Sequence, residues 1–102
     1  GLSPFYADLD DHFTSKPLEG NFHGAVITTP SLGIKTWYEV DSAYKHWMIW
    51  NCEREGSFIC IEPQNWRVNA PNLPISEGES GMASLLPGEN FVAKAKIWAE
   101  CL

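Results

Sequence analysis

Carboxylates in two places of this chain could do acid–base chemistry. Asp10 and Asp11 are neighbours near the start of the sequence, and Glu62 comes directly before Pro63. A Glu or Asp side chain held against a substrate hydroxyl can remove its proton as a general base. A pair of carboxylates at a defined separation could instead hydrolyse a glycosidic bond. Either chemistry needs a fold that brings the two segments together.

The spacing of the histidines and cysteines argues against a metal site and against disulfides. His12, His23 and His46 are not spaced as metal ligands usually are, so we expect no metal site. We expect His12 in a loop or behind the site, and His46 on the surface at the start of a strand, from which it could approach Glu62. The three cysteines, an odd number without C-x-x-C spacing, predict free thiols and a reducing cytoplasm.

Short runs of β-branched and aromatic residues, separated by Gly, Pro and Asn clusters, predict an all-β antiparallel β-sandwich. The expected strands are residues 25–29, 34–40, 46–51, 57–62 and 91–100, joined as a meander. Residues 30–33 and 53–56 are expected to close hairpins, and residues 86–89 to form a type II turn. In the last strand apolar residues alternate with Lys and Glu, which predicts one buried and one solvent-facing side.

The predicted hairpin over residues 53–56 sets a register. It places Trp47 opposite Glu62 and Trp50 opposite Ile59, and it separates the neighbouring cysteines. Glu62 would then lie beside an aromatic ring, partly desolvated, where the long loop of residues 63–81 begins. Such a setting suits a general base. On the residues alone, a solvated edge glutamate is the simpler interpretation.

Composition excludes several classes of partner. The 102 residues suffice for one domain, and shares of 44% hydrophobic and 20% charged residues are those of a globular protein. A formal net charge of −6 disfavours nucleic acid, which is bound by clustered Lys and Arg. The chain has no apolar run long enough to cross a membrane. A neutral small molecule is the expected ligand.

Four short segments carry a resemblance to a known family. Residues 58–64 read FICIEPQ, residues 69–72 read NAPN and residues 86–89 read LPGE before a last strand. This order resembles the C-terminal signature of the aldose 1-epimerases, or galactose mutarotases. Residues 10–13, DDHF, are similar to the family's D-x-x-F segment. The resemblance implies that Glu62 is the catalytic base and that Asp10 binds sugar hydroxyls, with Asp11, Gln64 and Trp47 as further candidates for substrate binding.

The same resemblance implies what the chain lacks. The family's general acid is a histidine on an earlier strand, and nothing in this sequence matches it. We therefore expect residues 1–102 to be a single unit, the C-terminal portion of a galactose mutarotase-like supersandwich, paired with an N-terminal portion that supplies the acid. The implied reaction interconverts the α and β anomers of an aldohexose and needs no cofactor. We expect the chain alone to be inactive.

Other functions stay open at this point. The carboxylate pair could belong to a glycosidase, and Arg67 leaves a sugar phosphate as an option. A non-catalytic carbohydrate-binding domain would need an aromatic platform built from the five tryptophans, which are Trp37, Trp47, Trp50, Trp66 and Trp98. Alternation points Trp47 and Trp50 to opposite sides, so at most some of them share one surface. We expect Trp37 and Trp98 in the core.

Overall fold

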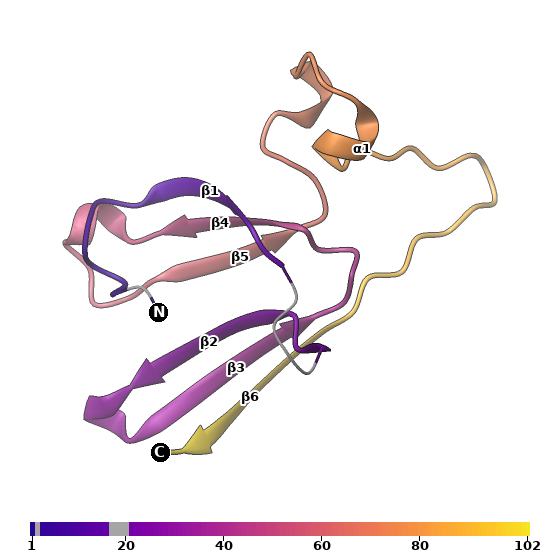
Figure 1. Ribbon diagram of the computed structural model, residues 1–102. Coiled ribbons are helices and arrows are strands. Elements are labelled where there is room, and N and C mark those ends of the chain that lie inside the picture. The colour runs from indigo at the N-terminus through magenta and orange to yellow at the C-terminus, as the bar shows by residue number, and fades with distance from the viewer. Residues whose placement is uncertain (2, 17–20) are drawn as a thin grey trace.

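The computed structural model describes residues 1, 3–16 and 21–102 of the chain. Within these residues the fold has six strands and one short helix, and it confirms the predicted all-β antiparallel class (Figure 1). The elements are β1 (Asp10–Thr14), β2 (Gly24–Thr29), β3 (Ile34–Val40), β4 (His46–Trp50), β5 (Cys60–Gln64), α1 (Glu77–Ser80) and β6 (Ala95–Cys101). The described part contains no helix that is long and apolar enough to span a membrane.

The strands form two sheets, as expected for a sandwich, but they are not joined as the meander that we expected. One sheet has the order β1-β4-β5 and the other has the order β2-β3-β6, with antiparallel neighbours throughout. Residues 41–45 carry the chain from one sheet to the other, so β3 and β4 do not pair. Figure 1 shows the two sheets facing each other, with β6 returning beside β3 after a long connection. The strand β1, which pairs with β4, was not predicted.

Two predicted turns are present. A 3-10 turn over Pro30–Leu32 joins β2 to β3, and Gly33 after it has φ 64°, a conformation that glycine adopts at little cost. In the turn of residues 86–89, Gly88 has φ 89° and the Glu89 amide donates to the Leu86 carbonyl at 3.0 Å. These features are those of the expected type II turn.

The connection between β4 and β5 differs from the prediction. It spans residues 51–59 and contains a 3-10 turn over Cys52–Arg54, whose three residues all have positive φ. Because this loop is longer than the four-residue turn that we expected, the register shifts by one residue. Glu62 therefore pairs with Met48, and Trp47 pairs with Pro63. A shift of one residue moves every side chain of a strand to the other face of the sheet.

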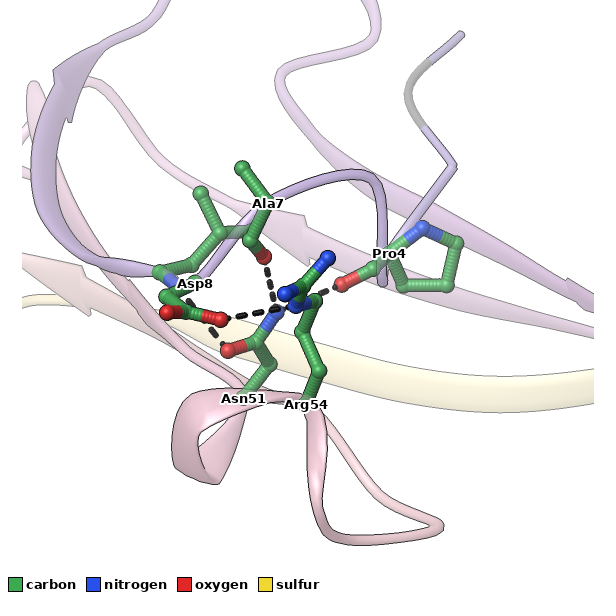
Figure 2. Close-up of polar contacts among 6 residues, drawn as sticks. Pro4, Ala7, Asp8, Asn51 and Arg54 are labelled. Atoms are coloured by element: carbon green, nitrogen blue, oxygen red, sulfur yellow. Dashed lines mark hydrogen bonds and ion pairs between the residues drawn. The ribbon is translucent and has the colours of Figure 1, made fainter.

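The side chain of Asn51 holds the N-terminal segment against this loop (Figure 2). Its Oδ1 accepts the Leu9 amide at 2.9 Å, while its Nδ2 donates to the carbonyls of Pro4 and Ala7 at 3.0 and 2.7 Å. Asn51 is fully buried, and these bonds satisfy its amide. The backbone N–H of Asn51 also donates to the Leu9 carbonyl at 3.1 Å. These bonds, which we call the Asn51 clamp, fix the chain directly before Asp10.

The core lies between the two sheets and is small. Trp47 of β4 is 4% exposed and packs edge-on against Tyr38 of β3, with ring centroids 6.1 Å apart. Leu9, Val40 and Ala70 are the other buried hydrophobic residues in the described part of the chain. The apolar side of β6 is not covered: Ile97 is 64% exposed. The expectation that this side is buried is therefore wrong, because no described element packs over it.

Trp37 and Trp98 lie on the outward side of their sheet rather than in the core. They are cross-strand partners whose rings stack at 5.7 Å with planes 2° apart. Lys35 Nζ lies 4.3 Å from the Trp37 ring and Lys96 Nζ lies 4.7 Å from the Trp98 ring, and both indole N–H groups donate to Glu100. This stack of cations and rings ties the edge strand β6 to β3.

Candidate functional site

The outward side of sheet β1-β4-β5 carries the candidate site. The contact between Trp47 and Tyr38 identifies the inward side of β4. Because side chains alternate along a strand, the residues on either side of Trp47 and their cross-strand partners point outward. We call this surface the site face. Its residues are Asp10, His12 and Thr14 of β1, His46, Met48 and Trp50 of β4, and Cys60, Glu62 and Gln64 of β5.

Three of the predicted site residues share this face. Glu62 and Gln64 lie on β5, and Asp10 lies on β1 at the other edge of the sheet. Asp10 and Glu62 are two strands and two residues apart, which corresponds to about 12 Å between their Cα atoms. The space between them lies over Met48 and Trp50. A small polar ligand on this face could reach both carboxylates at once.

Two other predicted residues lie elsewhere. Trp47 points into the core, where its Nε1 donates to Ser15 Oγ at 2.7 Å, so its predicted place beside Glu62 is wrong. Asp11 pairs with Ile49 and points to the opposite side from Asp10. Glu62 itself is exposed, so the expected desolvation by an aromatic neighbour is wrong as well.

The structure corrects both predictions about His12 and His46. His12 lies within β1 rather than in a loop, and His46 is 6% exposed rather than on the surface. His12 Nε2 and His46 Nδ1 form a hydrogen bond of 3.0 Å, and the two rings stack with centroids 5.1 Å apart. One ring donates to the other, so the pair holds a fixed mutual orientation.

Burial and neighbouring cations keep this pair neutral. Burial lowers the pKa of His12, with a further contribution from the positive charge of Arg67. Burial also lowers the pKa of His46, and repulsion from a protonated His12, from Arg67 and from Lys45 lowers it further. Since an unperturbed histidine has a pKa of about 6.5, both imidazoles are uncharged at neutral pH. They present nitrogen donors and acceptors without a charge.

The loop after β5 closes one end of the site face. The Arg67 amide donates to the Ser80 carbonyl at 2.7 Å, and Ser76 and Glu79 form a capping box that starts α1. A Cβ placed on Gly81 would lie 3.2 Å from His46 Nε2, so the loop backbone packs directly against this imidazole. The predicted long loop is therefore ordered, and it explains the burial of His46.

The aromatic residue on the site face is Trp50. Its side chain is 37% exposed, and its ring contacts Phe58 edge-on with centroids 5.5 Å apart. The prediction missed Trp50, His12, His46 and Met48 as site residues. The strand alternation contained the signal for the three that lie on β4, but the hairpin register assigned the wrong parity.

The described residues offer no metal site, and the hollow between the two sheets is mostly apolar. Among the described residues, no group of three His, Cys, Asp or Glu side chains could hold a metal ion. All three cysteines are free thiols, as predicted. A hollow of about 420 Å³ between the sheets is lined by apolar residues such as Ile27, Ile49 and Ile61 and offers few groups to a sugar.

Comparison with known proteins supports the fold. No family model matches the sequence. A solved structure, a galactose mutarotase-like protein from Clostridium acetobutylicum, superimposes on the whole chain with a TM-score of 0.90 at 30% sequence identity. The resemblance to the galactose mutarotase-like family is confirmed. The chain spans 31% of the length of that protein, so its two sheets correspond to part of that protein's fold.

Proposed function

We propose that this chain carries the base half of an aldose 1-epimerase-type site, which interconverts the α and β anomers of a free aldohexose. The observation that carries the proposal is the shared position of Glu62, Asp10 and Gln64 on one open face of a mutarotase-like sheet. In this role Glu62 is the base, and Asp10 and Gln64 hold hydroxyl groups of the sugar. The three free thiols suit a cytoplasmic protein.

The proposed reaction needs one base and one acid. Glu62 removes the proton from the anomeric hydroxyl, and the released electron pair forms the carbonyl as the bond between C1 and the ring oxygen breaks. The acid protonates the ring oxygen. Rotation about the bond between C1 and C2 then exposes the other carbonyl face, and reclosure returns both protons. No cofactor takes part in these steps.

The acid would come from a further portion of the fold, an N-terminal portion that contributes the remaining strands. The accessible surface of the chain supports such a partner. It measures 7449 Å², whereas a compact monomer of 11.4 kDa exposes about 5,800 Å². The excess of about 1,700 Å² is larger than the roughly 800 Å² that one partner buries in a standard interface.

The positions of the tryptophans argue against a carbohydrate-binding platform. Trp47 is inside the core, and the stacked rings of Trp37 and Trp98 lie on the other sheet beneath lysine side chains. Trp50 is the single tryptophan among the strand residues of the site face, and Trp66 lies in the loop after β5. The alternative of a non-catalytic binding domain therefore lacks the broad aromatic surface that it would need.

The test is the effect of two substitutions on sugar binding, measured by NMR titration of the 102-residue chain with D-galactose and D-glucose. Asp10→Asn should weaken binding about tenfold, since a hydrogen bond to a charged group contributes about 1.5 kcal/mol or more. Glu62→Gln should keep the affinity within about twofold, because the base acts mainly in the transition state. Polarimetry should find no catalysis by the chain alone. Absence of sugar binding would contradict the proposal, and measurable turnover would show that the chain has its own acid.

A further inference from the structure

The histidine pair on the site face has no role in the proposed function as described so far. His12 and Glu62 are the two partners of Met48, one from each neighbouring strand. Their Cα atoms are therefore about 10 Å apart across the central strand. A sugar that lies over the Met48 thioether and reaches the Glu62 carboxylate has His12 on its opposite side.

We propose that His12 is a ligand for a sugar hydroxyl, across Met48 from Glu62, and that His46 is the residue that positions it. This inference rests on the proposed function. It adds a binding residue from β1 and gives a reason for the contact between the two imidazoles.

The geometry leaves one nitrogen of His12 for a ligand. Its Nε2 is engaged by His46 Nδ1 at 3.0 Å, and its Nδ1 has no hydrogen-bond partner among the residues that the structure describes. His46 is held by burial and by the loop backbone at Gly81. The His12 ring is therefore oriented before a ligand arrives, which lowers the entropy cost of binding.

The chemistry of the pair matches a neutral ligand. A neutral imidazole has one donor and one acceptor nitrogen, and a hydroxyl group can complement either. An uncharged pair also avoids the cost of burying a charge against an uncharged sugar. The ligand class that fits is a free aldose, bound through a hydroxyl that lies away from the anomeric centre.

Two substitutions of His12 distinguish a ligand from a structural residue. The side-chain amide of Asn can replace Nδ1, and the longer Gln amide can replace Nε2. His12→Gln therefore keeps the contact with His46 and loses the free nitrogen, whereas His12→Asn does the reverse. If His12 binds the sugar, His12→Gln should weaken galactose binding about tenfold and His12→Asn about threefold. A residue that only stabilises the sheet should give the opposite order.

The measurement is an NMR titration with D-galactose that follows the Glu62 and Gln64 amides in the 102-residue chain. His46→Asn, which keeps a partner for His12, should stay near wild-type affinity, and His46→Ala should lose several-fold. Wild-type-like binding by His12→Gln would overturn the inference and leave the proposed function intact. Failure of the wild-type chain to bind either sugar would overturn the proposed function, and the inference with it.

Discussion

At the scale of single residues, Asn51 matters because its buried side-chain amide joins the N-terminal segment to the loop after β4. Its three side-chain hydrogen bonds reach Leu9, Pro4 and Ala7, and they hold the chain that leads into Asp10. Asn51→Ala removes all of them and leaves the Leu9 amide without a partner in a buried place. We expect a loss of about 2–3 kcal/mol in the free energy of unfolding, measured by urea denaturation.

The matched control is Asn90→Ala, since Asn90 is exposed and lies outside the strands. Its unfolding free energy should stay within about 0.5 kcal/mol of wild type. Equal stability of the two variants would contradict the structural role of the Asn51 clamp.

The same scale shows what could be predicted about the site. The resemblance picked out Glu62, Asp10 and Gln64, and the structure places all three on one face. The prediction for Trp47 was wrong because the loop between β4 and β5 shifts the strand register by one residue. Such a shift places Trp47 on the side of the sheet opposite to Glu62. The burial of His46 could not be predicted, because it depends on the loop at Gly81, which is distant in sequence.

At the scale of elements, the pairing of β2 with β3 depends on a glycine. A Cβ on Gly24 would collide with the backbone carbonyl oxygen of Tyr38, which cannot move without breaking the sheet. Gly24→Ala should therefore destabilise the chain by about 1–3 kcal/mol, measured by thermal or urea unfolding. Gly78→Ala in α1 is the control, since its Cβ would meet only Ser76 Oγ at 4.0 Å, and it should cause no loss. Wild-type stability of Gly24→Ala would contradict the close approach of the two strands.

Prediction of the elements succeeded where local sequence is decisive. The bounds of β3 agree with the predicted residues 34–40, because an alternating run there is closed by a turn that contains Pro and Gly. β1 was missed, since Asp10-Asp11-His12 has low intrinsic strand preference and forms a strand only through its pairing with β4. The apolar side of β6 has the pattern of a buried face, but no described element packs over it.

At the scale of the whole molecule, the chain is extended and thinly packed. Its radius of gyration is 15.6 Å, whereas a compact domain of this length has about 13 Å. Its apolar residues are mostly half-buried or exposed, and four hydrophobic side chains in the described part are buried. The chain spans 31% of the length of the galactose mutarotase-like protein that it resembles.

The central claim, that this chain holds the base of an epimerase site completed by another portion, can be tested by complementation. The chain would be mixed with the part of the Clostridium acetobutylicum protein that it does not cover, and complex formation would be checked by size-exclusion chromatography. Polarimetry of α-D-galactose and α-D-glucose would then report anomer interconversion. We predict catalysis by the complex, a loss of about 10²-fold or more in kcat for Glu62→Gln, and no loss for the exposed control Glu55→Gln. A stable complex without catalysis, or a Glu62→Gln complex as active as wild type, would contradict the claim.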